Sequence, residues 1–218
     1  EAYEESLLNG VKTRKEMIQL LIDEGIWSKE YQDELDKFDD KKEDLKVAIF
    51  ENFLRPSTRE KFRQELRDLE KREKKLNLIK NANSHLDCEG IATFTKSVWI
   101  TENSIFFEDG TPYDFSTMSL TAVMNRVNAS ILDMEDFREL AREDPFKNIW
   151  MIDKNVESIF NRKICELSDS QRLLMTWVRV YDAVSESTEQ PPDAVIEDDD
   201  ALDGWFVLQK RKREKEQS

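Results

Sequence analysis

Two runs of apolar residues, separated by the short turn RPST, constrain this fold more than any other feature of the sequence. The first run continues from Tyr31 to Phe53 and the second from Phe62 to Leu76, and the apolar residues of both recur mostly at steps of three and four. This spacing is typical of helices that pack along a single seam. Because a turn this short brings the second helix straight back along the first, the sequence predicts an antiparallel coiled-coil hairpin.

Each run contains one charged residue at a seam position, Lys42 in the first and Glu73 in the second. If the residues that flank the turn face one another, the numbers of facing residues sum to 114 or 115, and Lys42 then lies opposite Glu73. We predict a salt bridge or a water-bridged pair that fixes the register, because desolvation offsets most of the stability such a pair could add. The alternative is a rotation that points both charges outward and brings Val47 and Leu78 into the seam.

The scarcity of turn-forming residues favours long helices. The chain of 218 residues contains only five glycines and five prolines, whereas domains built from strands need many turns. One short β-hairpin is expected around residues 104–114, where the loop EDGTPYDF occurs. We therefore predict an all-α fold that consists of a long antiparallel coiled-coil hairpin and a compact helical body, with at most one short β-hairpin.

The helix-capping pattern and the linkers suggest three parts. Residues 1–83 are expected to form a helical lead-in and the hairpin, residues 84–186 the compact helical body, and residues 187–218 a linker followed by an amphipathic C-terminal helix. The linker is the segment STEQPPD. Helix starts are predicted from side chains that can accept a hydrogen bond from a free backbone amide. These are Thr13, Ser57, Asp87, Asp133, Asp144 and Ser168.

The acidic segment Asp198–Asp203 admits two interpretations. A calcium loop with Gly204 as its sixth position would need an oxygen ligand at Ala201 and a glutamate at Lys210, so the segment does not fit that loop. A helix start explains more residues, because aspartates in a first turn complement the helix dipole. The apolar stripe of this helix is our candidate partner-binding surface, and it consists of Leu202, Trp205, Phe206 and Gln209.

The sequence leaves open two alternatives to a purely structural C-terminal segment. In the first, the Asp198–Asp203 cluster binds a metal ion, as part of a metal-dependent enzyme or a metal-binding protein. In the second, the basic run KRKREK that follows binds nucleic acid. The net charge of −14 disfavours the second, because binding to a phosphate backbone depends on a cationic surface. An acidic surface instead suits a protein partner with a basic surface.

The remaining residues with reactive side chains form no complete site in the sequence. His85 and Cys88 provide half of a zinc site, which would need Cys165 and a carboxylate to complete it. We therefore predict no catalytic residues, no metal and no cofactor. The aromatic residues of the second half are expected to be core residues rather than a ligand cage. They are Trp150, Phe160, Trp177 and Tyr181.

Two segments resemble virion and morphogenesis proteins of tailed bacteriophages, of which the tail-assembly chaperones are the nearest class. These segments are LNGVKTRKEMIQLLIDEGIWS (Leu8–Ser28) and LSDSQRLLMTWVRVYDAVSESTEQPPDAVIEDDDALDGW (Leu167–Trp205). The resemblance implies a helical, non-enzymatic protein that binds other proteins and has no catalytic residues. With no apolar run of membrane-spanning length and no signal peptide in the sequence, we expect the protein in the host cytoplasm or in the virion.

Overall fold

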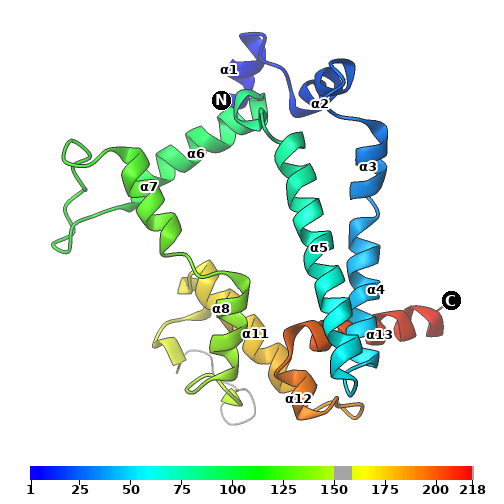
Figure 1. Cartoon of the computed structure of the whole chain (residues 1–218). Helices are drawn as coiled ribbons and strands as arrows, with labels where there is room; N and C mark the ends of the chain where they lie inside the picture. Colours follow the sequence, from blue (N-terminus) through cyan, green and yellow to red (C-terminus); the bar gives the residue numbers. More distant parts are fainter. Residues whose placement is uncertain (150–158, 218) are drawn as a thin grey trace. The chain divides into compact units, whose positions relative to one another are not determined.

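The described part of the protein is helical, with a single isolated bridge as its only β-structure. The structure is a computed structural model that describes residues 1–149 and 159–217 (Figure 1). The bridge joins Phe106 and Pro112 in antiparallel fashion, and the Phe107 amide donates to the Thr111 carbonyl at 2.8 Å beside it. The all-α prediction is therefore confirmed, and the β-hairpin expected at 104–114 is reduced to one bridge. None of the described helices is long and apolar enough to cross a bilayer.

Two compact units make up the described chain, and both are discontinuous in sequence. Unit 1 consists of Glu1–Leu45 and Glu60–Ser130, and unit 2 consists of Lys46–Arg59 together with the described residues from Ile131 onward. The residues next to the RPST turn thus belong to unit 2, while the rest of the predicted hairpin belongs to unit 1. These two units do not coincide with the three parts expected from the sequence, which had boundaries after residues 83 and 186. Those boundaries stay a prediction.

Unit 1 begins with short helices whose ends agree with local sequence signals. Thr13 caps its helix as predicted, because its hydroxyl accepts from the Glu16 amide while the Glu16 carboxylate accepts from the Thr13 amide at 2.8 Å. Gly10 and Gly25 follow two of these helices with φ angles of 78° and 69°, a conformation that glycine adopts without strain. The first helices are α1 (Ala2–Leu8), α2 (Arg14–Asp23) and α3 (Lys29–Leu35).

The first arm of the predicted hairpin is interrupted, because α3 ends at Leu35 and α4 (Phe38–Glu51) begins three residues later. Asp36 caps α3, and its carboxylate accepts from the side-chain amide of Gln32 at 2.7 Å. Two aspartates lie in the first turn of α4, where they complement the positive end of the helix dipole. The heptad spacing does not reveal this break, since apolar residues on both sides of it keep their period.

Within unit 1, α4 packs antiparallel to α5 (Pro56–Lys80). Lys42 contacts Glu73, and Phe38 lies in the same buried cluster as Leu76, so positions ascend in one helix as they descend in the other. Of the two residues that the alternative rotation would bring into the seam, Leu78 is 65% exposed, whereas Val47 is buried in unit 2. That this packing continues as a coiled coil up to the turn stays a prediction.

The rest of unit 1 follows α5 through a short 3-10 helix. Asp87 caps the next helix as predicted and accepts from the Gly90 amide at 2.6 Å. The same carboxylate accepts from the Arg14 guanidinium at 2.9 Å, which ties this helix start to α2. The elements are η1 (Ser84–Leu86), α6 (Cys88–Ser104) and α7 (Leu120–Ala129).

Unit 2 is built around α8 and α11, which pack against each other. The buried apolar side chains of both helices belong to one core cluster. Predicted caps at Asp133 and Ser168 are both present, each as a reciprocal capping box. Asp144 and Pro145 lie in a turn rather than at a helix start, and α5 begins at Pro56 rather than after a Ser57 cap. The elements are α8 (Met134–Arg142), η2 (Ile164–Glu166), α11 (Asp169–Ser185), α12 (Asp193–Ile196) and α13 (Asp199–Glu216).

Gly204 allows α13 to pack directly on the backbone of α4 within unit 2. A Cβ atom at this position would lie 2.0 Å from the Lys46 carbonyl oxygen and 2.9 Å from the Phe50 Cβ. No side chain fits in that space, so the glycine of the DDDALDG segment serves helix packing. The interpretation of this segment as a helix start is confirmed, because Asp198 caps α13 and accepts from the Ala201 amide at 3.2 Å.

Candidate functional site

A network of buried charges lies inside unit 2, where α8, α11 and α13 meet. Its centre is Arg138, whose side chain is only 8% exposed. The guanidinium donates to the Asp203 carboxylate at 2.9 Å and to the Tyr181 hydroxyl at 3.1 Å, and it forms an ion pair with Asp199 at 3.1 Å. Burial acts to lower the pKa of Arg138, but the carboxylate charge of Asp203 and the bond to Tyr181 raise it above its ordinary value. Arg138 therefore remains charged inside the core.

A second arginine and a lysine complete the neutralisation of these carboxylates. Arg142 contacts Asp199 at 2.6 Å, and Lys46 contacts Asp203 at 2.7 Å. Burial raises the pKa of the Tyr181 phenol, although its hydrogen bond with Arg138 opposes that rise. The network thus joins the hairpin end of α4 to three helices of unit 2, and each of the two carboxylates has two cationic partners.

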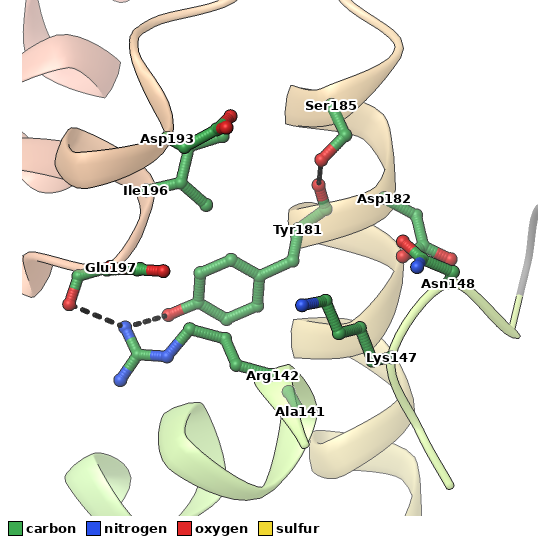
Figure 2. A pocket seen from close by; sticks show the side chains of 10 residues that line it. All are labelled: Ala141, Arg142, Lys147, Asn148, Tyr181, Asp182, Ser185, Asp193, Ile196 and Glu197. Carbon is green, nitrogen blue, oxygen red and sulfur yellow. Dashed lines mark hydrogen bonds between the residues drawn. The ribbon is translucent and has the colours of Figure 1, made fainter. Parts of the chain in front are cut away.

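Next to this network lies a pocket of about 230 Å³ (Figure 2). Tyr181 extends from α11 toward the α12 residues, and the Arg142 guanidinium lies 5.3 Å from the centre of its ring. The Tyr181 hydroxyl donates to Asp199 at 3.2 Å, and the Ser185 hydroxyl donates to the Tyr181 carbonyl at 3.1 Å. The lining residues are Ala141, Arg142, Lys147, Asn148, Tyr181, Asp182, Ser185, Asp193, Ile196 and Glu197.

The two hydroxyls and the arginine of this pocket are bound to other groups of the protein. Both hydroxyls that line it are engaged in internal hydrogen bonds, and the guanidinium of Arg142 is held by Asp199. Nucleophilic catalysis needs a hydroxyl or thiol within reach of a base that can accept its proton. The described lining residues include neither a histidine nor a thiol, and the Ser185 proton is directed to a backbone carbonyl.

The aspartates of the Asp198–Asp203 cluster, our candidate metal ligands, are already used in unit 2. Asp198 caps α13 and lies 3.7 Å from the Arg59 guanidinium, while Asp199 and Asp203 are each paired with two cations. Carboxylates that bind a metal ion must turn toward a common point, and the point on which Asp199 and Asp203 converge is occupied by the Arg138 guanidinium. Among the described residues, no group of three or more histidine, cysteine or acidic side chains is arranged to bind a metal.

The candidate partner-binding stripe on α13 packs against the protein's own chain. Leu202 is fully buried and Trp205 is 8% exposed, and both belong to the core of unit 2. Phe206 packs at the edge of that core, and Gln209 donates to Glu189 at 3.0 Å. The stripe has the periodicity of an amphipathic helix, but the face it presents is internal. That these residues bind a partner stays a prediction.

The predicted register pair is in contact inside unit 1. The Lys42 ammonium donates to both carboxylate oxygens of Glu73, at 3.1 and 3.2 Å, and it also lies 2.8 Å from Asp39. The two seam side chains are 23% and 26% exposed, so the layer is partly hydrated. Burial acts to lower the pKa of Lys42, but its hydrogen bonds to both carboxylates raise it overall. That the pair determines the register stays a prediction.

The half zinc site has opposite environments at its two residues. His85 is exposed on η1, whereas Cys88 is fully buried and its thiol donates to the Val11 carbonyl at 3.2 Å. Burial raises the pKa of the Cys88 thiol, which disfavours the thiolate that metals and substrates require. Both Cys88 and Cys165 are free thiols.

Of the predicted core aromatics, Trp150 lies outside the described residues, while Phe160, Trp177 and Tyr181 pack in the core of unit 2.

Sequence reasoning missed a set of exposed aromatic side chains in unit 1. Phe94 and Trp99 of α6 are 62% and 64% exposed, and Phe106 and Phe107, in the loop that follows, are 54% and 46% exposed. The sequence places this segment in a compact helical body, where such residues would be buried. Their spacing is a poor guide, since Phe94 and Trp99 lie five residues apart and so point in different directions around α6.

Comparisons with known proteins do not assign this chain to a family. No protein-family model, no curated protein and no solved structure matches it.

Proposed function

We propose that this protein is a non-enzymatic component that binds another protein through the aromatic residues of α6 and the following loop. In this proposal the protein acts in the structure or the tail assembly of a tailed phage. This part of the proposal rests on the resemblance of the segments Leu8–Ser28 and Leu167–Trp205 to phage proteins. The observation that carries the proposal is the exposure of Phe94 and Trp99, which are 62% and 64% accessible to solvent.

Exposed aromatic residues favour a binding role for physical reasons. Tryptophan and phenylalanine each remove a large apolar area from water when covered, and they are prominent among the residues that dominate binding energy at interfaces. Single exposed apolar residues are ordinary on protein surfaces, but several large ones within one short segment are typical of an interaction surface. Four aromatic side chains between residues 94 and 107 are 46–64% exposed, and because Phe94 and Trp99 lie on different sides of α6, a partner would contact that helix on more than one side.

The charge of the chain adds a property of the partner. With a net charge of −14, the protein attracts surfaces that carry an excess of lysine and arginine. The carboxylates of the Asp198–Asp203 cluster are paired internally, which leaves the metal-dependent alternative without an observation in its favour. The proposal is therefore a protein partner with an apolar contact region and a basic surround.

The test uses a photo-reactive phenylalanine analogue placed at position 94 or 99. Irradiation of cells that make the whole protein together with the phage structural proteins should give one covalent adduct of defined mass. The same analogue at Leu8, which is 88% exposed on α1, is the matched control and should not give that adduct.

A second arm measures retention instead of cross-linking. The partner identified from the adduct is captured on the immobilised protein. The double substitution of Phe94→Ala and Trp99→Ala should reduce the amount of partner captured by about tenfold or more, as expected for the loss of two interface aromatics. Leu8→Ala should leave recovery unchanged, and circular dichroism should show the same helix content in all variants. Adducts that are equal at positions 8, 94 and 99, or undiminished recovery with the double variant, would contradict the proposal.

A further inference from the structure

The chain contains one Asn-Gly sequence, Asn9–Gly10, and it lies at the end of α1. Both residues are exposed, and the Asn9 side chain makes no hydrogen bond to any residue that the structure describes. In this pair the backbone nitrogen of the second residue readily attacks the side-chain amide of the first, because glycine has no Cβ to hinder the approach. Asn9 is therefore a candidate for chemical change without an enzyme.

Two backbone hydrogen bonds hold this pair in its turn. The Asn9 amide donates to the Glu5 carbonyl at 3.0 Å, and the Gly10 amide donates to the Leu7 carbonyl at 3.1 Å. Attack by the Gly10 nitrogen requires the second bond to break and the backbone of Asn9, whose ψ angle is 6°, to rotate. Because α1 has seven residues and no side-chain hydrogen bond at its N-cap, its last turn opens at a low cost in free energy.

We propose that Asn9 is a site of spontaneous deamidation, and that the opening of α1 controls its rate. The Gly10 nitrogen attacks the side-chain carbonyl carbon of Asn9 and gives up its proton. The new C–N bond closes a succinimide ring, and the side-chain nitrogen takes up the proton and leaves as ammonia. Water then adds to either carbonyl of the ring and breaks its C–N bond. The product at position 9 is aspartate or isoaspartate, and the reaction needs only water as a co-reactant.

The other exposed pair of this kind, Asp109–Gly110, is protected by its own turn. The Asp109 carboxylate accepts from the Thr111 amide at 2.9 Å and from the Thr111 hydroxyl at 2.6 Å. These bonds lower the pKa of Asp109, so the carboxylate stays ionised. An ionised carboxylate offers no leaving group to the attacking nitrogen, whereas the neutral amide of Asn9 does. The reaction therefore belongs to Asn9 and not to Asp109.

Deamidation at this position disturbs the anchoring of α6 within unit 1. The segment that follows Gly10 is bound to the start of α6, because the Cys88 amide donates to the Lys12 carbonyl at 3.0 Å and the Cys88 thiol donates to the Val11 carbonyl at 3.2 Å. Isoaspartate lengthens the backbone by one carbon atom, and either product places a negative charge at the negative end of the α1 dipole. Both changes act directly before the segment that covers Cys88, so its buried thiol becomes accessible.

The test is a time course of the whole protein at neutral pH and physiological temperature, followed by peptide mass spectrometry. The internal control is Asn128, which is exposed in the last turn of α7 but is followed by an alanine. The change from amide to acid should appear at Asn9 about tenfold faster than at Asn128, because the alanine Cβ hinders the attack. Isoaspartate should accompany aspartate at position 9, since both come from the succinimide.

A thiol reagent reports the effect on α6. Labelling of Cys88, located by peptide mapping, should rise with the converted fraction in the wild type. It should stay low over the same period in Asn9→Gln, because the longer side chain closes the ring far less readily.

Two substitutions at Glu5 test the control by helix opening. Glu5 is exposed within α1, so Glu5→Gly and Glu5→Ala remove the same carboxylate and differ mainly in helix propensity. Glycine should speed conversion at Asn9 about fivefold relative to alanine, because it favours the open form of the helix. Conversion at Asn128, which lies on another helix, should be equal in the two variants.

Three results would overturn the proposal. They are conversion at Asn9 that is no faster than at Asn128, a product that contains aspartate alone, and equal rates in the two Glu5 variants. A Cys88 thiol that stays unreactive in fully converted protein would overturn the inferred effect on α6.

Discussion

The two units differ in which chemical groups they enclose. Unit 2 takes charged groups into its interior, where Arg138 is 8% exposed and is shared by Asp199 and Asp203. Unit 1 buries one carboxylate, Asp87, but it leaves Phe94 and Trp99 mostly in contact with solvent. Its central core is small and consists of Leu21, Trp27, Phe38 and Leu76 with a few partly buried neighbours.

This difference leads us to expect different responses to mutation in the two units. A buried ionic network requires all of its partners at once, so unit 2 is expected to be strongly destabilised when one partner is removed. Phe94 and Trp99 are mostly exposed and so add little to the stability of the isolated chain, and unit 1 is therefore expected to tolerate changes there and to lose mainly binding. The contrast also explains why the binding proposal concerns unit 1. Hydrogen exchange followed by mass spectrometry reports on each unit separately and can test this contrast.

The largest effect is expected for Arg138→Met. Removal of the guanidinium leaves the Asp199 and Asp203 carboxylates with one cation each and deprives the Tyr181 hydroxyl of a donor. We expect unit 2 to lose about 3 kcal/mol of unfolding free energy, because breaking a buried pair costs more than the pair contributes. Exchange in α8, α11 and α13 should accelerate while exchange in α2 stays unchanged.

The control for this prediction is Arg172→Met on α11. Arg172 is 52% exposed and lies 3.5 Å from an exposed aspartate, so its loss should change the stability by less than about 0.5 kcal/mol. Equal effects of the two substitutions would mean that the interior network contributes no more than a surface pair.

A smaller effect is expected for Gly204→Ala. The new methyl group would lie 2.0 Å from the Lys46 carbonyl oxygen, so α13 must move away from α4. Overpacking of this kind costs roughly 1–3 kcal/mol, and alanine returns up to about 1 kcal/mol through its greater helix propensity. We expect a net loss of about 2 kcal/mol in thermal or urea unfolding, confined to unit 2.

Gly90→Ala is the counterpart in unit 1. Its methyl group would lie 1.8 Å from the Ser84 carbonyl oxygen, and it should accelerate exchange at the start of α6 without affecting α13. If both glycine substitutions loosened the same helices, the two units would not be independently packed.

The smallest effect is expected for the seam pair of unit 1. Lys42→Met and Glu73→Gln should each cost about 0.5–1 kcal/mol, because both side chains are about one quarter exposed and solvent screens the pair. A double-mutant cycle in urea should give a coupling energy of about 0.5 kcal/mol. Substitution of both residues by leucine should recover stability, because apolar groups then close the layer.

Lys71→Met provides the reference for a solvated charge, since Lys71 lies 3.6 Å from an exposed aspartate on the same helix. If the losses of unfolding free energy at Lys42 and Glu73 are additive and as small as the loss at Lys71, the two seam charges interact with solvent and not with each other. The prediction that the pair sets the register would then be wrong.

Features that depend on neighbouring residues could be predicted from the sequence, and those that depend on distant ones could not. The caps at Thr13, Asp87, Ser168 and Asp198 are predictable because a capping side chain and its amide lie three residues apart. The Lys42–Glu73 contact could also be found, because a short turn fixes which residues of two helices face one another.

The buried network was beyond such reasoning. Arg138 is separated from Tyr181 by 43 residues and from Asp203 by 65, and nothing in its own surroundings distinguishes it from the other arginines. In the sequence, Gly204 belongs to an acidic loop motif, although its role is the close approach of α13 to Lys46. The stripe on α13 shows correctly which side of the helix is apolar, but periodicity cannot tell an internal face from an external one.

The assignment of the hairpin tip to unit 2 has a consequence for synthesis of the chain. Lys46 is separated by 157 residues from Asp203, its partner on α13. During translation the tip therefore emerges long before the helix that covers it, whereas unit 1 has all of its residues by Ser130. Unit 1 is thus able to fold on the ribosome while the tip waits uncovered, and unit 2 closes only after α13 has emerged. A nascent chain stalled before α13 should accordingly be cleaved by proteases near residues 46–59 and protected in α2.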